Sequence, residues 1–154
     1  MNDQYYTADP SSESKPVPCA FPYRGHGLNF MTDAGVFSKG ELDQGTRLLL
    51  DALPSLSGDV LDLGCGSGIL SITALRLGAK TAVGVDIDPK AEDIARENAG
   101  YNGFAAPAFQ ALTGNVTADK ALMRKLAAEH YDLVLVNIVA DVIIGLAPIL
   151  PEFL

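Results

Sequence analysis

One stretch of the sequence constrains the fold most strongly, because an apolar run leads directly into three closely spaced glycines. It reads Val60-Leu61-Asp62-Leu63-Gly64-Cys65-Gly66-Ser67-Gly68-Ile69-Leu70. The apolar residues that open the stretch are typical of a strand covered on both faces. The glycines allow a tight turn and let a ligand approach the main chain. The free amide groups of a following helix would point toward that ligand. The stretch therefore predicts a buried strand, a glycine-rich turn and a helix that begins near Ser67.

The same order of strand and helix recurs along the rest of the chain. We expect strands over residues 59–63, 81–86, about 105–111 and 131–136, and helices over about 67–77, 89–101, 117–129 and 140–154, the last interrupted by Pro148 and Pro151. Asp88 is suited to cap the helix that starts at Pro89, and Asn102-Gly103 to end it. Strands that alternate with helices predict an α/β fold, a Rossmann-like doubly wound parallel sheet with right-handed crossovers.

The segment before this repeat has a different organisation. Residues 17–24 and 28–32 flank a glycine-containing turn that holds His26, which predicts a short hairpin. A loop over 33–40 and an amphipathic helix over about 41–53 should follow. Ser, Pro, Asp and Glu dominate the first residues, as is typical of a flexible arm. We therefore expect three units: an arm (1–16), a hairpin and helix (17–58) and a Rossmann-like ligand-binding domain (59–154).

Composition narrows the class of protein. The chain has 11 basic and 19 acidic residues and a formal charge of −8, which argues against tight non-specific binding of nucleic acid. Its two cysteines, Cys19 and Cys65, suggest reduced thiols in a cytoplasmic protein. The polar start does not resemble a signal peptide, no apolar run could span a bilayer, and no metal-ligand spacing is legible. We expect no membrane and no metal among its partners.

Two carboxylates indicate which ligand the glycine turn binds. The turn has the spacing G-x-G-x-G, whereas the dinucleotide fingerprint places its third glycine one residue later. Asp62 would repel a phosphate but could hold a cation such as an amino-acid ammonium group. Asp86 ends the next strand, where a carboxylate can bond to ribose hydroxyls, although alone it could also be a strand-end cap. Together they describe a nucleoside with a cationic, phosphate-free tail, which fits S-adenosylmethionine better than NAD.

Two motifs carry a resemblance to a known family. Residues 60–68 and the run Val-Gly-Val-Asp-Ile-Asp-Pro at 83–89 resemble the cofactor motifs of class I S-adenosylmethionine-dependent methyltransferases. By this resemblance Asp62, Gly64 and Gly66 contact the methionine part of the cofactor, Asp86 holds the ribose and Ile87 lies against adenine. Asn115 lies where the family often has an acid that bonds the adenine amine, and an amide can bond there too. The residues implied in cofactor binding are Asp62, Gly64, Cys65, Gly66, Gly68, Asp86, Ile87 and Asn115.

The resemblance to subfamilies divides along the chain. Residues 28–53 resemble the small-subunit ribosomal RNA guanine methyltransferases, whereas residues 62–154 resemble the lysine methyltransferases of ribosomal protein L11. The RNA enzymes are expected to carry Asn-Pro-Pro-aromatic after the fourth strand, where this chain has Asn-Ile-Val-Ala at 137–140. Amine methylation of a ribosomal protein is therefore favoured. A ribosomal RNA guanine methyltransferase and a cofactor-binding fragment without activity are the alternatives. Asn137 is the candidate for orienting the target amine, with a local strand-end cap as its structural alternative.

The resemblance also implies a sheet of seven strands, of which this chain would contain about four. We therefore expect a C-terminally truncated sheet whose fourth strand, 131–136, is an exposed apolar edge. Such an edge predicts low solubility or self-association. Because the two subfamily resemblances meet near 60–70, where the families read alike, the chain is either a natural divergent member or one joined at the shared motif.

Overall fold

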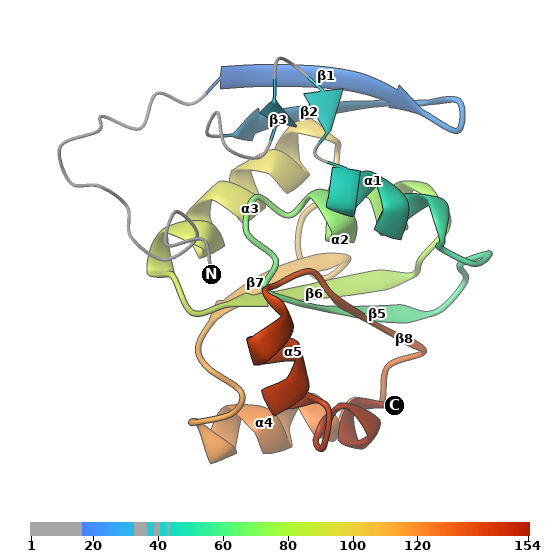
Figure 1. Ribbon diagram of the computed structural model, residues 1–154. Coiled ribbons are helices and arrows are strands. Elements are labelled where there is room, and N and C mark those ends of the chain that lie inside the picture. Colours follow the sequence, from blue (N-terminus) through green and yellow to red (C-terminus); the bar gives the residue numbers. More distant parts are fainter. Residues whose placement is uncertain (1–16, 33–36, 39–40, 43) are drawn as a thin grey trace, which may run out of the picture.

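A four-stranded parallel sheet forms the centre of the computed structural model, with helices on both faces (Figure 1). The structure describes residues 17–32, 37–38, 41–42 and 44–154, so the predicted arm (1–16) and most of the predicted loop (33–40) lie outside the described residues. The strands are β1 (Val17–Tyr23), β2 (His26–Thr32), β3 (Phe37–Ser38), β4 (Glu41–Leu42), β5 (Asp59–Leu63), β6 (Thr81–Asp86), β7 (Phe109–Thr113) and β8 (Leu133–Val136). The helices are α1 (Gln44–Asp51), α2 (Ile69–Arg76), α3 (Pro89–Tyr101), α4 (Lys120–Ala127), α5 (Ala140–Leu146) and the 3₁₀ helix η2 (Leu150–Phe153).

The sheet has the order β7-β6-β5-β8, and all its neighbouring strands are parallel. Leu61 of β5 lies opposite Val83 of β6 and Val134 of β8, so β5 is bonded on both edges. The chain moves outward from β5 to β6 and β7, then returns to the other side of β5 for β8. Ligands of open α/β sheets bind outside the carboxyl ends of the strands at such a reversal. The predicted α/β fold with a parallel sheet is confirmed.

Side chains of the central strands alternate between two apolar cores. Val60 and Ala82 belong to the core under α2, α3 and the hairpin β1–β2. Leu61, Leu63 and Val85 belong to the core under α4, α5 and η2. In Figure 1 these two groups of helices lie above and below the sheet. This burial on both faces explains why β5 and β6 carry apolar residues that point to either face of the sheet.

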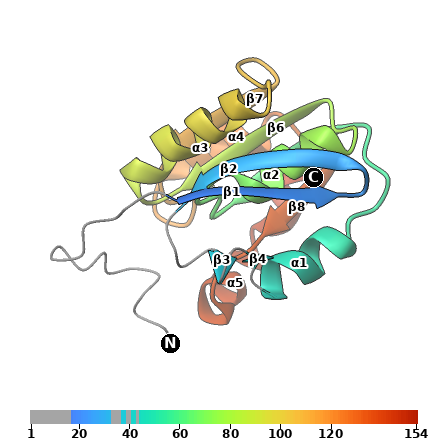
Figure 2. The same ribbon diagram turned by 90° about the horizontal axis from the view of Figure 1, so that it is seen from above.

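The hairpin β1–β2 forms an additional layer outside the helices. Its strands are antiparallel, and Tyr23 pairs with His26 across a turn at Arg24-Gly25. The predicted hairpin is confirmed, but His26 is the first residue of β2 and does not lie in the turn. Leu28 and Phe30 are buried in the core shared with α2 and α3. Figure 2 shows the hairpin lying over α2 and beside α3.

Several predicted ends differ from the observed ones. The first helix begins at Gln44 and not near Glu41, because Glu41 and Leu42 pair with β3. β7 begins at Phe109 and not near Ala105, since Pro107 lacks the amide hydrogen that a strand ladder needs. The last helical stretch divides into α5 and η2 around Pro148, for the same reason.

Three other elements are shorter than predicted. β8 begins at Leu133, because the Tyr131 amide donates to the Phe153 carbonyl of η2. α2 begins at Ile69, with Gly68 as its N-cap, and α4 begins at Lys120, where the Asp119 side chain caps it. By contrast, β5, β6 and α3 have the predicted bounds.

Candidate functional site

The glycine turn lies at the carboxyl ends of β5 and β6. Hydrogen bonds from the Gly64 and Cys65 amides to the Val85 carbonyl, 2.7 and 3.1 Å, join the turn to β6. Gly64 has a φ of 77°, and a Cβ there would collide with Ile138 Cγ2. Gly66 has a φ of 51°, and a Cβ there would meet nothing within 4 Å. Gly64 is therefore required by packing, whereas Gly66 leaves its main chain open to a ligand.

Gly68 and the side chain of Cys65, which also belong to the turn, face the protein interior. A Cβ on Gly68 would lie 3.2 Å from Ala95, so this glycine lets α3 approach the start of α2. The Cys65 side chain is buried and packs against Gly84. Burial, together with the nearby carboxylates of Asp62 and Asp86, raises the pKa of the Cys65 thiol well above its usual range. The thiol is therefore protonated at neutral pH, and Cys65 contributes to the turn through its main chain.

Asp62 lies beneath the turn with 0% of its surface exposed. Its Oδ2 accepts a hydrogen bond of 2.7 Å from the Ser71 hydroxyl of α2, whereas its Oδ1 has no hydrogen-bond partner among the described residues. Burial raises the pKa of Asp62 to about 6, the bond from Ser71 opposes this, and the negative charge of Asp86 adds to it. A buried carboxylate oxygen without a donor is costly. The negative charge of Asp62 therefore favours a cation bound at the turn.

Asp86 connects the end of β6 to the glycine turn. Its Oδ2 accepts a hydrogen bond of 2.9 Å from the Gly66 amide, and its Oδ1 accepts one of 2.9 Å from the Asp88 amide. Asp86 therefore acts as a cap at the end of β6, which is the alternative role that the sequence suggested for it. The carboxylate is partly exposed, and each of its oxygens can accept a further hydrogen bond. Asp88 caps α3 through a bond from the Lys90 amide, as predicted.

The two residues assigned to adenine lie next to this acid. Ile87 follows Asp86 and is 54% exposed, so its apolar side chain is accessible to a ligand. The Gly114 amide donates to the Asp86 carbonyl at 2.9 Å, so the turn that carries Asn115 lies beside the end of β6. Asn115 is exposed, and its Oδ1 accepts bonds from the amide and hydroxyl of Thr117. The amide oxygen of Asn115 therefore stabilises its own turn.

Asn137 follows β8 and lies on the other side of the glycine turn. A Cβ on Gly64 would come within 3.9 Å of the Asn137 carbonyl oxygen. The Asn137 side-chain amide donates to the Thr46 hydroxyl of α1 at 3.1 Å. This partner is distant in the sequence, so the bond is not the local cap considered above. The structure thus brings Asn137, the glycine turn and Asp86 to the same edge of the sheet.

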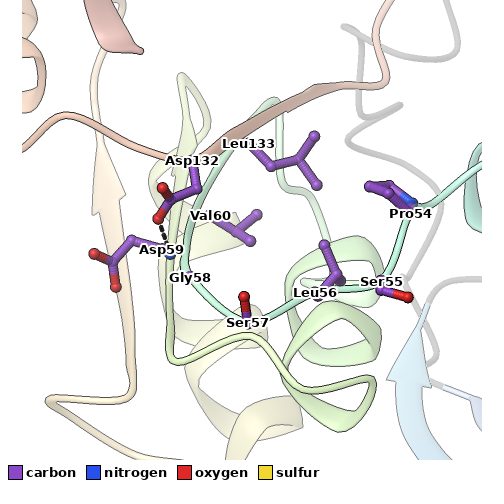
Figure 3. Close-up of a pocket in the computed structure, with 9 residues that line it drawn as sticks. All are labelled: Pro54, Ser55, Leu56, Ser57, Gly58, Asp59, Val60, Asp132 and Leu133. Carbon is purple, nitrogen blue, oxygen red and sulfur yellow. Dashed lines mark hydrogen bonds between the residues drawn. The ribbon is translucent and has the colours of Figure 1, made fainter.

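A surface pocket of about 170 Å³ lies at the opposite end of the strands (Figure 3). Residues 54–60, Asp132 and Leu133 line it, and the Asp132 carboxylate accepts a bond of 2.8 Å from the Asp59 amide. Because ligands of such sheets bind at the carboxyl ends of the strands, this pocket is not the candidate site. In the part of the chain that the structure describes, no group of three or more His, Cys, Asp or Glu side chains could hold a metal ion. No helix there is long and apolar enough to cross a membrane.

Three polar residues that support the site were not predicted. Ser71 bonds to Asp62, Thr46 bonds to Asn137, and Asn98 of α3 donates to the Ser67 carbonyl at 2.9 Å. The only local signal for any of them is a pair of asparagines four residues apart, of which Asn98 lies in a helix interior, where asparagine is disfavoured, and Asn102 lies at the C-cap of that helix.

The fold and the site together define a class of protein. A parallel sheet with a reversal beside β5, a glycine turn after that strand and an acid at the end of the next strand are the features of a Rossmann-like nucleoside-binding domain. Residues 23–154 match the family described as "Ribosomal protein L11 methyltransferase (PrmA)". Because the match covers well over half of the sequence, the chain belongs to this family of S-adenosylmethionine-dependent methyltransferases.

Individual relatives agree with this assignment. The ribosomal protein L11 methyltransferase of Agathobacter rectalis is 47% identical over 93 residues, which are 60% of this chain and 29% of that protein. The protein of the same name from Lachnospira eligens is 38% identical over 132 residues, which are 84% of this chain and 41% of that protein. The chain thus spans less than half the length of these two curated relatives.

Solved structures show the same fold. The ribosomal protein L11 methylase of Lactobacillus delbrueckii subsp. bulgaricus has a TM-score of 0.56 and 32% identity, over 71% of this chain and 53% of that one. An RNA methyltransferase of Salinibacter ruber in complex with S-adenosyl-L-homocysteine has a TM-score of 0.54 and 30% identity, over 70% and 65%.

Proposed function

We propose that this chain binds S-adenosylmethionine across the carboxyl ends of β5 and β6, as the cofactor-binding part of a methyltransferase of ribosomal protein L11. The observation that carries the proposal is the hydrogen bond of 2.9 Å between the Gly66 amide and the Asp86 carboxylate. It joins the glycine turn and the strand-end acid into one site. Membership of the L11 methyltransferase family and the names of the relatives support the substrate.

Each part of the cofactor has a complementary group in this proposal. The methionine part lies along Gly64–Gly68, where Gly66 leaves the main chain open. Asp62 has no exposed surface, so we assign it a role through its negative charge, opposite the ammonium group. Asp86 accepts bonds from the ribose hydroxyls with its free acceptor capacity. Ile87 lies against adenine, and Asn115 lies near the adenine amine.

The chemistry of the bound cofactor is transfer of a methyl group from its sulfonium to a nucleophile in line with the breaking bond. Alignment supplies much of the rate of such a displacement. We assign Asn137 to this alignment. Its side-chain Nδ2 donates to Thr46, which fixes the amide plane and leaves Oδ1 as an acceptor for a hydrogen of the target amine. The amine must be deprotonated when it attacks.

Transfer of labelled methyl groups tests the proposed reaction. Purified ribosomal protein L11 and protein-free ribosomal RNA are each incubated with the chain and labelled S-adenosylmethionine. Label in the protein, lost in the variant Asp86→Ala, is the expected result. Label in RNA alone would show that the substrate is ribosomal RNA and not the protein. Cofactor binding without transfer to either would identify the chain as a cofactor-binding unit that needs the rest of a longer protein.

Two other interpretations of the sequence stay predictions. Self-association along the fourth strand is consistent with the place of β8 at the edge of the described sheet and with the 70% exposure of Ile144. The division into a hairpin and helix (17–58) and a Rossmann-like domain (59–154) is a proposal about organisation. The core that Leu28 and Leu50 share with Ile72 supports joint folding of the two units.

A further inference from the structure

Two buried asparagines of α3 hold the N-terminal hairpin. Asn98 accepts a bond of 2.7 Å from the Met31 amide and donates one of 2.9 Å to the Met31 carbonyl. Asn102 accepts a bond of 3.0 Å from the Asn29 amide and donates one of 2.7 Å to the Asn29 carbonyl. The two side chains thus bond alternate residues of β2 as a neighbouring strand would. The hairpin is therefore docked on α3 by specific polar contacts as well as by its apolar side chains.

Asn98 makes one bond that Asn102 does not, and it reaches the glycine turn. Its Nδ2 also donates to the Ser67 carbonyl at 2.9 Å. The Ser67–Gly68 peptide group is planar, so its C=O and N–H point in opposite directions. The Gly68 amide donates to the Cys65 carbonyl at 2.8 Å. Both ends of this peptide group are therefore held, one by the turn itself and the other by Asn98.

We infer that Asn98 is a positioning residue for the cofactor turn, and that the same side chain also holds the hairpin. Asn98 fixes the second half of the turn, and Asp86 fixes the first half through the Gly66 amide. Because a single buried amide bonds both the hairpin strand and the turn, its loss releases the Met31 main chain and the Ser67 carbonyl together, whereas displacement of the hairpin alone leaves the bond to Ser67 in place. This inference rests on the proposed function for its ligand. The hydrogen bonds that hold the turn do not depend on the proposed function.

The neighbouring asparagine provides a matched control. Asn98 and Asn102 are 0% and 3% exposed and bond the same strand; Asn98 lies within α3, and Asn102 lies four residues later at its C-cap. Each makes three hydrogen bonds, two to β2 and one elsewhere. The third bond of Asn98 goes to Ser67, and that of Asn102 goes to the Asn98 carbonyl within α3. Replacement of either residue should loosen the hairpin, but only replacement of Asn98 should loosen the turn.

The test compares Asn98→Ala with Asn102→Ala in the full chain. S-adenosylhomocysteine is titrated by calorimetry, and hydrogen exchange is followed in peptides that cover residues 63–70. We expect Asn98→Ala to weaken binding about tenfold, which corresponds to about 1.4 kcal/mol and lies within the range for loss of one hydrogen bond. Asn102→Ala should change it less than about threefold. Exchange in the turn peptides should accelerate in Asn98→Ala alone, while exchange in β2 accelerates in both variants.

The outcomes separate this inference from the proposed function. Equal effects of the two variants on binding and on turn exchange would overturn the inference and leave Asn98 a structural residue only. A wild-type chain that does not bind S-adenosylhomocysteine would overturn the proposed function. Turn exchange then decides the inference alone, with faster exchange in Asn98→Ala as its support. If Asn98→Ala does not fold, Asn98→Leu and Asn102→Leu replace the pair, because leucine has nearly the shape of asparagine and adds no buried charge, while at position 98 it removes the donor to Ser67.

Discussion

The substitution Asp62→Asn should remove the part of the pH dependence of stability that comes from this buried carboxyl. Burial raises the pKa of this carboxyl from 3.8 to about 6 in the folded chain. The folded state therefore binds this proton more tightly than the unfolded state does. The stability that protonated Asp62 contributes is fully present below pH 3.8 and is lost as the pH rises through about 6. A difference of 6 − 3.8 = 2.2 pKa units corresponds to about 3 kcal/mol of unfolding free energy.

Urea unfolding of the ligand-free chain measures this loss. The linkage relation places about 1 kcal/mol of it between about pH 5 and about pH 8. The free energy of unfolding of Asp62→Asn, relative to wild type, should therefore increase by about 1 kcal/mol over this interval. The variant can keep the bond from the Ser71 hydroxyl, but it buries an unpaired amide donor. The change with pH is thus diagnostic, and the absolute stability is not.

The control is Asp88→Asn, which removes one exposed negative charge and keeps a residue that caps helices well. The gain in stability with pH of Asp62→Asn should exceed any change with pH in Asp88→Asn, because the Asp62 carboxyl is fully buried and Asp88 is exposed. A difference between Asp62→Asn and wild type that stays constant over the same interval would refute the argument from burial. A difference that falls as the pH rises would show that the folded chain stabilises the Asp62 charge, which is the opposite sign.

Three further predictions concern the glycine turn and Asn137. Gly64→Ala should destabilise the chain by roughly 1–2 kcal/mol from its backbone conformation alone, and the collision with Ile138 should add to this loss. Urea unfolding measures the change, and a stability within error of wild type would contradict the prediction. Gly66→Ala should cost roughly 1–2 kcal/mol of stability from its positive φ, leave the fold intact and weaken S-adenosylhomocysteine binding at least about tenfold in calorimetry, because the new methyl group enters space that the ligand would fill. Normal affinity would show that the ligand lies elsewhere. Asn137→Ala should lower the rate of methyl transfer with little change in cofactor affinity, and an equal loss of both would assign Asn137 to the cofactor.

Local signals predicted the elements whose ends are set locally. The bounds of α3 follow from the Asp88 cap and Pro89 at its start, and β6 follows from an apolar run that ends in Asp86. The start of α1 was missed, because the pairing of Glu41 and Leu42 with β3 competes with helix formation. Where the end of a helix or strand depends on contacts with another segment, the local sequence pattern does not predict it.

The same distinction holds for the candidate site. The side of the sheet at which Asp62, Gly66 and Asp86 meet could be predicted, because carboxyl ends of neighbouring parallel strands share one edge. The bonds of Asn98 to Met31 and of Asn137 to Thr46 join residues 67 and 91 positions apart. They depend on how the hairpin and α1 pack on the sheet, which no local spacing encodes.

The most direct test of the central claim is calorimetric titration of S-adenosylmethionine into the wild-type chain and into two carboxylate variants. Asp86→Asn alters the acid that holds the Gly66 amide, and Asp132→Asn alters the acid of the pocket at the opposite end of the strands. The account predicts saturable binding of one cofactor per chain, weakened at least about tenfold by Asp86→Asn and unchanged by Asp132→Asn. Absence of binding to the wild type, or equal affinities for wild type and Asp86→Asn, would contradict it.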